Sequence, residues 1–415
     1  MNKLKYLDLF AGAGGLSDGF LQTGLYDEIA AVEWLKPQVD TLRKRLKNKW
    51  GYDGVEESVM HFDIQRESEL FGGWKDKSFG TGKGLDYFVN RSKGIDIVIG
   101  GPPCQAYSIA GRVRDKNNMY DDYRNYLFEH YLSVVKRYQP KFFVFENVPG
   151  MLSARPTGGP LVTELVEKGF ASIDYEIIDD LKKYAVINAK DYNVPQSRKR
   201  VIIVGVNKKL ISNNIDIQME LRKFYTDILP KYKSKKEITV FNAIGDLQKF
   251  KPIFDIESHK IRNSYSEIPN SGLELQWQKP RYQNLRDIEI FRMLSKDIEE
   301  ETKLYTDSKE LSKVYEQKVG SKSPIHRYHV LRPDKPSTTI IAHLYKDGNR
   351  FIHYDSKQSR TITPREAARI QSFDDDFEFV GSQGATYQMI GNAVPPKLAN
   401  ALGKAINDLY IKISE

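Results

Sequence analysis

The chain is poor in the residues that build disulfide-linked or metal-centred proteins. A single cysteine, Cys104, occurs in 415 residues, which excludes a disulfide framework and any cysteine-based zinc or iron–sulfur site. His326 and His329 are the only close pair among the seven histidines, and no cysteine or carboxylate cluster lies near them in the sequence. We therefore expect no metal site.

Long apolar runs are also missing. No stretch approaches the about 20 apolar residues that span a bilayer, and Asp8 interrupts the N-terminal apolar run too early for a signal peptide. We therefore expect a cytoplasmic protein in a reducing compartment, with no membrane partner. Internal repeats are absent, and a content of 40% hydrophobic and 28% charged residues is typical of a globular protein.

Acidic residues are scarce in one part of the chain. The net charge is +8, and residues 181–250 alone hold 15 Lys and Arg against 6 Asp and Glu, which accounts for the whole excess. Such a focused positive charge suits a polyanionic partner. Composition alone fits a solvated, lysine-rich surface equally well.

The first 206 residues alternate short apolar runs with amphipathic stretches, which is typical of repeated strand–helix units. We predict an α/β fold with a doubly wound, mainly parallel sheet, followed by a second, smaller and irregular domain. A last amphipathic helix is expected over Pro396–Ile413. The expected strands are Lys5–Phe10, Ile29–Glu33, Ile95–Gly100, Lys141–Glu146 and Val201–Val206.

A glycine-rich turn, Asp8–Gly15, follows the first expected strand and opens a helix. Its glycines let a ligand approach the backbone near the helix N-terminus. The dinucleotide fingerprint requires a third glycine where this chain has Ser17, which counts against a pyrophosphate. Glu33 ends the next strand, where an acid binds the ribose of NAD or S-adenosylmethionine. These residues alone do not decide between NAD, S-adenosylmethionine and a turn that binds no ligand.

Reactive side chains follow the later strands. Cys104 comes after Ile95–Gly100 and Glu146 ends the next strand, so both belong at the sheet edge where doubly wound folds bind ligands. Arg198 and Arg200 precede the last strand and share one side by its alternation. With few cations nearby, a buried Glu146 would be protonated more easily than in water. Singly, these residues also suit a buried thiol, a capping glutamate and a solvated turn.

One reaction uses this set together with a sulfonium methyl donor. Carbon 5 of cytosine is too weak a nucleophile to take a methyl group directly, but addition of a thiolate to carbon 6 moves electron density onto carbon 5. A carboxylic acid that protonates ring nitrogen 3, and an arginine at the 2-oxo group, stabilise that adduct.

Several segments resemble the DNA cytosine-5 methyltransferases, above all the bacterial restriction–modification enzymes, in order and in residue type. The resemblance covers residues 4–206 and about 336–410. It implies a Rossmann-like fold that binds S-adenosylmethionine, double-stranded DNA as the partner, and a cognate restriction endonuclease that acts on the same site without direct contact. The segments are Asp8–Gly15, Gly101–Gln105, Glu146–Val148, Gln196–Arg200, Arg360–Phe373 and Gly391–Pro396.

By this resemblance Cys104 is the nucleophile and Glu146 the acid at the ring nitrogen. Arg200 contacts the 2-oxo group, and Arg198 braces the site. The Pro103 backbone matches a contact to the cytosine amino group.

The resemblance also implies a cofactor site, in which Trp34 stacks on the adenine and Asp63 binds its amino group. Residues 105–125 match a loop that closes over DNA. The other cofactor-binding positions are Phe10, Gly12, Gly14, Glu33, Ile64, Pro103, Leu127 and Asn392.

The family pattern divides the chain into a catalytic and cofactor-binding domain (1–206), a target-recognition domain (207–335) and a part that returns to the catalytic domain (336–415). Cytosine in a duplex is out of reach of a thiol, so the base must be flipped out. Ala106-Tyr107 and Asp374 depart from the residues common in the family, away from the chemistry.

Other functions remain open. An RNA (tRNA) cytosine-5 methyltransferase would use the same cysteine and glutamate, but the long unassigned region 207–335 favours DNA. A nicotinamide oxidoreductase would explain the glycine turn and leave Cys104, Glu146 and Arg200 unexplained. A catalytically inactive DNA-binding relative is disfavoured, because every reactive position is filled.

Overall fold

The computed structural model describes residues 3–102, 127–155, 159–212, 214–305, 308–320, 328–346 and 348–414. The chain forms two compact units. The first, here called the sheet unit, contains residues 1–192, 198–235 and 393–415, and the second unit contains residues 193–197 and 236–392.

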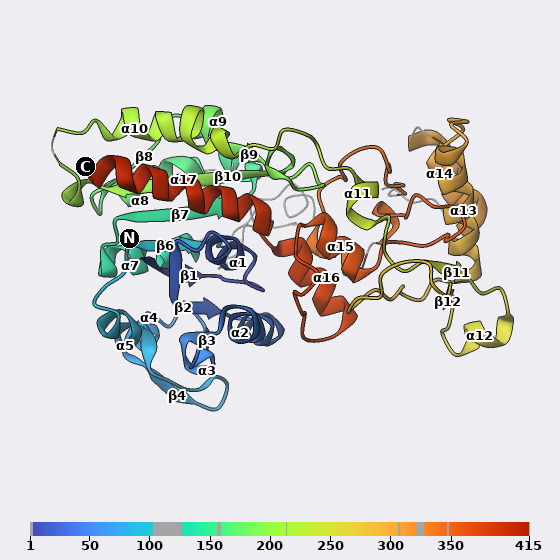
Figure 1. The fold of residues 1–415 in the computed structure, drawn as a ribbon, viewed down its shortest axis with the longest axis horizontal. Helices are drawn as coiled ribbons and strands as arrows, with labels where there is room; N and C mark the ends of the chain where they lie inside the picture. Colours follow the sequence, from blue (N-terminus) through green and yellow to red (C-terminus); the bar gives the residue numbers. More distant parts are fainter. Residues whose placement is uncertain are drawn as a thin grey trace. The chain divides into compact units, whose positions relative to one another are not determined.

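Eight strands form one sheet in the described part of the sheet unit, in the order β3-β2-β1-β6-β7-β10-β8, with β9 paired to β10 (Figure 1). The pairs from β3 to β7 are parallel, and β10 is antiparallel to its neighbours β7, β8 and β9. The predicted doubly wound, mainly parallel sheet is confirmed. The strands are β1 Leu4–Leu9, β2 Tyr26–Glu33, β3 Val59–His61, β6 Ile97–Gly100, β7 Phe142–Asn147, β8 Tyr175–Ile177, β9 Val186–Asn188 and β10 Lys199–Asn207.

The strand order places the glycine-rich turn at the centre of the sheet edge. From β1 the chain passes outward through β2 and β3, and then crosses to β6 and β7 on the other side of β1. Ligands of doubly wound sheets bind at this switch point, beyond the carboxyl ends of the strands. The continuous apolar runs of β6 and β7 are fully buried, as expected of strands covered on both faces.

Helices cover the sheet, and the last one, α17 (Pro396–Ser414), packs against α1 (Gly15–Leu21). The Tyr26 hydroxyl donates a hydrogen bond to the Gly403 carbonyl at 2.6 Å. A Cβ atom at Gly19 would lie 2.3 Å from that of Ala399, so only glycine allows this approach. The other α-helices of the sheet unit are α2 Lys36–Trp50, α3 Val55–Ser58, α4 Glu67–Gly72, α5 Gly84–Arg91, α7 Leu127–Tyr138, α8 Val162–Ala171, α9 Leu181–Tyr184 and α10 Ile217–Lys223.

The units divide the chain at other positions than the expected boundaries at 206 and 335. Residues 207–235 belong to the sheet unit and residues 336–392 to the second unit. The physical reason for the first shift is burial: the Tyr225 hydroxyl donates to the Ile202 carbonyl and accepts from the Val204 N–H, both in β10. The role of residues 207–335 in target recognition stays a prediction.

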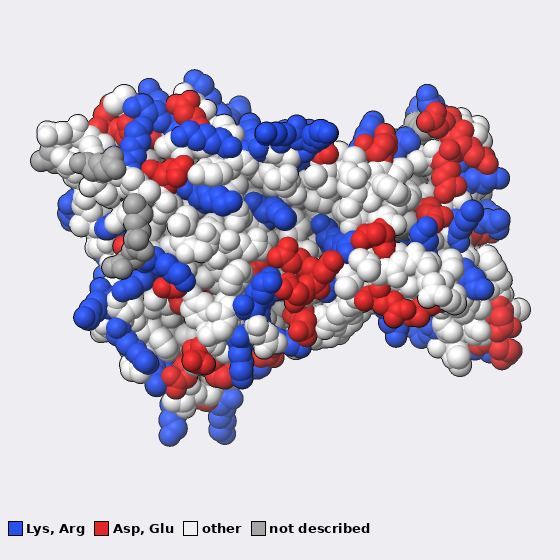
Figure 2. Space-filling model, in the orientation of Figure 1, with Lys and Arg blue, Asp and Glu red and all other residues white. Residues whose placement is uncertain are grey.

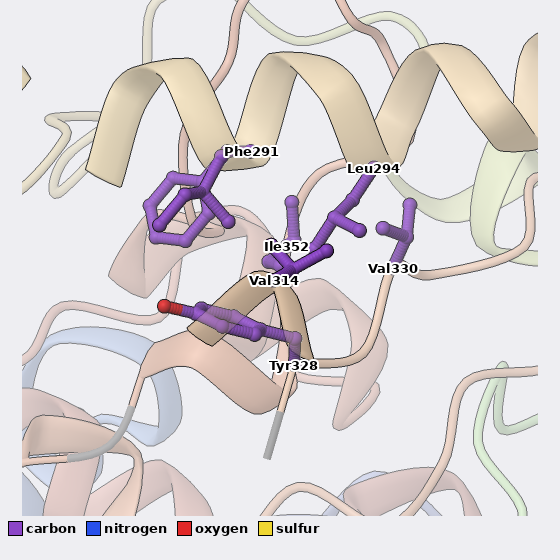
Figure 3. Packing of buried hydrophobic residues seen from close by; sticks show 7 residues of the cluster. Phe291, Leu294, Val314, Tyr328, Val330 and Ile352 are labelled. Atoms are coloured by element: carbon purple, nitrogen blue, oxygen red, sulfur yellow. The ribbon is translucent and has the colours of Figure 1, made fainter. Parts of the chain in front are cut away.

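The second unit has its own apolar core, formed largely by α13 (Leu285–Glu299), α14 (Ser308–Val319) and neighbouring segments (Figure 3). The core residues are Ile290, Phe291, Leu294, Val314, Tyr328, Val330 and Ile352. The remaining elements of this unit are α11 Val240–Ile244, β11 Phe250–Pro252, α12 Ile256–Lys260, β12 Tyr265–Glu267, α15 Pro364–Ile370 and α16 Gln383–Asn392.

No helix of the described residues, in either unit, is both long and apolar enough to cross a membrane.

Candidate active site

The turn after β1 has the backbone shape that a ligand-binding glycine loop needs. Phe10, Gly12 and Gly14 have φ angles of 57°, 57° and 86°, in the left-handed region that favours glycine. A Cβ at Gly14 would lie 2.5 Å from Leu42, whereas nothing lies within 4 Å of one at Gly12. The positive φ angles therefore favour glycine at both positions; a Cβ at Gly14 would also displace the Leu42 side chain of α2, whereas Gly12 faces open space.

Glu33 connects this turn to the end of β2. Its Oε2 accepts a hydrogen bond from the Gly12 N–H at 2.9 Å, and its Oε1 accepts one from the Leu35 N–H at 2.8 Å. Burial raises the pKa of Glu33, and these backbone donors oppose the shift. The next side chain, Trp34, is 50% exposed, so its indole is accessible for stacking. The structure thus brings together three of the predicted cofactor residues.

Asp63 and Ile64 follow β3, which pairs with β2 in parallel. Asp63 Oδ1 accepts a hydrogen bond from the Gln65 N–H at 3.0 Å, which fixes the carboxylate beside the strand end. Ile64 is buried, as is Leu127 at the start of α7. Glu33 and His61 are partners in the register, so Glu33, Trp34 and Asp63 lie at adjacent strand ends.

Glu146 and Arg200 form an ion pair at the same edge of the sheet. Arg200 Nε lies 2.8 Å from Glu146 Oε1, and each side chain is 12% exposed. Because β10 runs antiparallel to β7, the start of β10 lies beside the end of β7. The condition of few neighbouring cations, under which Glu146 would be protonated more easily than in water, is therefore not met.

A second arginine, Arg198, lies near the ion pair of Glu146 and Arg200. Arg198 is buried; burial and the neighbouring Arg200 cation lower its pKa, and the Glu146 carboxylate opposes this shift. A Cβ at Gly101 would lie 2.6 Å from Glu146 Oε2, so the chain leaving β6 passes directly beside the carboxylate. The structure places Glu146, Arg198, Arg200 and the segment that leads to Cys104 around one point.

Some of the predicted site residues are not among those that the structure places around Glu146. Pro103, Cys104 and the loop at residues 105–125 lie outside the described residues. Asn392 is the last residue of α16 in the second unit and is exposed. His326 also lies outside the described residues, and no group of three or more potential metal ligands occurs among those that are described.

The segment Arg360–Phe373, one of the family-like blocks, has a structural role in the second unit. Arg360 and Glu366 form a buried bidentate pair, with nitrogen–oxygen distances of 2.7 and 2.6 Å. Burial would raise the pKa of Glu366, but Arg360 outweighs burial and lowers it to about 2. The Thr363 N–H also donates to Glu366 and closes a capping box at the start of α15. The pair fixes the fold around α15.

One structural feature beside the cofactor residues was not predicted from the sequence. The glycine- and lysine-containing segment between α4 and α5 forms a short antiparallel hairpin, β4 (Trp74–Asp76) and β5 (Gly80–Gly82). Its glycines were a usable signal, because Gly73 and Gly80 have positive φ angles and a Cβ at Gly82 would lie 2.2 Å from the Trp74 ring.

Comparison with known proteins shows the family to which this site belongs. Residues 4–408 match the family described as C-5 cytosine-specific DNA methylase. The chain belongs to this family. The resemblance seen in the sequence is confirmed, and the protein is a DNA cytosine-5 methyltransferase by family.

Relatives match the methyltransferase over nearly its whole length. Type II methyltransferase M.Bpa9945I of Bacillus paralicheniformis is 31% identical, over 97% of this chain and 98% of its own. Type II methyltransferase M.MthTI of Methanothermobacter thermautotrophicus is 34% identical, over 96% and 95%.

Solved structures share the fold of this methyltransferase. A prophage-encoded protein of E. coli, described as a DNA modification methyltransferase, has a TM-score of 0.61 at 24% identity, over 99% of this chain and 100% of its own. Dnmt2 methyltransferase of S. pombe has a TM-score of 0.56 at 14% identity, with full coverage of both chains. The predicted Rossmann-like methyltransferase fold is confirmed.

Proposed function

We propose that this methyltransferase transfers a methyl group from S-adenosylmethionine to carbon 5 of a cytosine flipped out of a specific duplex sequence, as the modification enzyme of a type II restriction–modification system. The observation that carries the proposal is the Glu146–Arg200 pair at the carboxyl edge of the sheet. The segment leading to Cys104 passes beside this pair, and the glycine loop with Glu33 lies at the end of β1 in the same unit.

The described residues fit S-adenosylmethionine. Gly12 leaves open space at the loop, and the Glu33 carboxylate, held by two backbone donors, suits the ribose hydroxyls. The accessible Trp34 suits the adenine ring. When bound, the cofactor supplies an electrophilic methyl group.

The chain's own residues would prepare the base. The Cys104 thiolate forms a bond to carbon 6, and the electron pair of the 5,6 double bond moves toward carbon 5. Glu146 holds a proton at ring nitrogen 3, while Arg200, fixed by its contact with Glu146, offsets charge on the 2-oxo group. After methylation, loss of the carbon 5 proton and departure of the Cys104 sulfur restore the aromatic ring.

The predicted target-recognition region, residues 207–335, would hold the duplex during flipping. Lysines around position 235, where the chain passes from one unit to the other, support binding to phosphates: Lys231, Lys233, Lys235 and Lys236 are all exposed. On the face drawn in Figure 2, Lys and Arg side chains also lie over α10 and α17 of the sheet unit, with Asp and Glu side chains among them. Phosphate contacts of this kind position DNA without reading its sequence.

The test is a labelled-methyl assay with duplex DNA and tRNA as alternative substrates, followed by bisulfite sequencing of DNA from cells that express the protein. We expect methylation of cytosine in one DNA sequence context. Labelling of tRNA alone would refute DNA as the substrate and support the RNA alternative.

Trapping tests the covalent step. A duplex with 5-fluorocytosine at the mapped target should form an adduct that survives denaturation, because fluorine cannot leave as a proton does. Cys104→Ser should form no adduct and no product, while it still binds DNA and cofactor. Product formation by this variant above a few per cent of wild type would contradict attack by Cys104.

A further inference from the structure

The hairpin β4–β5 places one aromatic residue, Phe79, against both strand ends that carry predicted adenine-binding residues. The Phe79 ring centroid lies 6.3 Å from that of Trp34, which follows β2. It lies 5.1 Å from that of His61 and 5.3 Å from that of Phe62, at the end of β3. All three contacts are edge-to-face, with interplanar angles of 63–70°. Phe79 thus contacts both strand ends of the predicted cofactor site: the end of β2, which carries Glu33, and the end of β3, which is followed by Asp63.

The backbone of Phe79 is held on both sides. Its N–H donates to Asp76 Oδ1 at 2.8 Å, in a turn that also binds the Ser78 N–H. Its carbonyl accepts a hydrogen bond from Trp74 Nε1 at 3.3 Å. The position of this ring is therefore set by the hairpin.

The hairpin is in turn anchored to the sheet. The buried Trp74 indole stacks on Phe62, with centroids 3.9 Å apart and an interplanar angle of 26°. Arg66 forms an ion pair with Asp76 at 2.7 Å, and its guanidinium lies 4.9 Å from the Phe62 ring and 5.7 Å from the Phe79 ring. These contacts make the hairpin a rigid support beside β3.

Trp34 needs such a support, because half of its side chain is exposed. An edge contact with Phe79 restricts the indole while its face stays accessible for stacking. Pre-orientation of this kind lowers the entropy lost when a ligand binds.

We infer that Phe79 is a positioning residue of the cofactor site, which raises the affinity for the adenine end of S-adenosylmethionine by fixing the orientation of Trp34. The inference rests on the proposed use of that cofactor. It assigns a role to a hairpin that the catalytic chemistry does not otherwise involve.

The experiment compares Phe79→Ala with wild type in calorimetric titrations with S-adenosylmethionine and S-adenosylhomocysteine, and in methyl-transfer kinetics. Aromatic pairs contribute enough for a rise in Kd of about three- to tenfold. We expect the KM for the cofactor to rise likewise, while kcat at saturating cofactor and the KM for DNA stay unchanged. Phe79→Tyr should restore wild-type affinity.

Two controls separate positioning from a general loss of structure. Phe88→Ala removes another half-buried ring of the sheet unit, which packs on Tyr87 instead, and should leave the Kd unchanged. In a Trp34→Ala background, Phe79→Ala should weaken binding no further, because the two residues act as one unit.

A Kd for Phe79→Ala within twofold of wild type, or additive effects of the two alanine variants, would overturn the inference while DNA methylation by wild type upholds the proposed function. Conversely, cofactor binding that depends on Phe79 in a protein that methylates no cytosine would uphold the inference and refute the proposed function. A wild-type protein that binds neither compound would overturn both.

Discussion

Glu146→Gln tests the ion pair at the centre of the proposed reaction. Glutamine has almost the same shape, and its amide oxygen can still accept from Arg200 Nε, now 2.8 Å from the carboxylate. It cannot hold a proton for ring nitrogen 3. General acid catalysis contributes about 10²–10⁴-fold, or about 2.7–5.4 kcal/mol at 1.36 kcal/mol per factor of ten. We expect the rate of methyl transfer to fall by that factor.

The structure also predicts what the same substitution leaves unchanged. Cofactor binding should persist, because the glycine loop and Glu33 are connected to each other rather than to Glu146. Stability should fall by about 1–2 kcal/mol, since Arg200 and the buried Arg198 lose a neighbouring carboxylate and keep an amide in its place.

Single-turnover methyl transfer at saturating cofactor and DNA is the appropriate assay, because it isolates chemistry from product release. Calorimetry with S-adenosylhomocysteine and thermal unfolding are measured on the same preparations. Glu164→Gln, on α8, is the matched control and should behave as wild type. A Glu146→Gln rate within about threefold of wild type, with the fold and cofactor binding intact, would refute the role of Glu146 as the acid.

Three further predictions concern the cofactor, pH and DNA. Glu33→Ala should weaken S-adenosylmethionine binding by about 1.5–3 kcal/mol in calorimetry; an unchanged Kd would separate Glu33 from the cofactor site. Burial lowers the pKa of His353 to about 4, so its contribution to stability is complete above pH 6.5 and is lost as the pH falls toward 4. In urea unfolding, the stability difference between wild type and His353→Gln should therefore be about 2 kcal/mol smaller at pH 5 than at pH 7, because the other titrating groups cancel in this comparison; a difference that does not change with pH would refute the role of His353. Neutralising Lys233, Lys235 and Lys236 should weaken binding to all DNA sequences and reduce the salt slope by about 0.9 for each phosphate that the protein no longer neutralises; an equal slope would make them solvated surface.

Local sequence was sufficient to predict the parts of the site that lie on single segments. The turn after β1 needs left-handed backbone at Gly12 and Gly14, and these glycines are visible directly. The apolar runs within Ile95–Gly100 and Lys141–Glu146 predicted strands, and the structure has β6 and β7 there, buried because they are covered on both faces. Their alternation with amphipathic stretches predicted the doubly wound sheet, and the family resemblance implied its methyltransferase type.

The sequence indicated that Glu146 and the two arginines serve one site, but not which contacts between distant segments hold them there. Glu146 gains its arginine neighbours because β10 runs antiparallel to β7, and strand direction depends on how the chain returns through the sheet. The boundary at residue 235 depends in the same way on whether residues 207–235 bury their apolar side chains against β10. Neither pairing has a local signature.

The sequence by itself determined the chemistry, because the reactive groups, the glycine turn and the order of the blocks are properties of short segments. The tertiary structure alone decided which groups are in direct contact: the ion pair of Glu146 with Arg200, the hydrogen bond from the Gly12 N–H to Glu33, and the contact of Phe79 with Trp34. The physical reason is that ion pairing, burial and ring packing depend on distances of a few ångströms between residues that lie tens of positions apart in the chain.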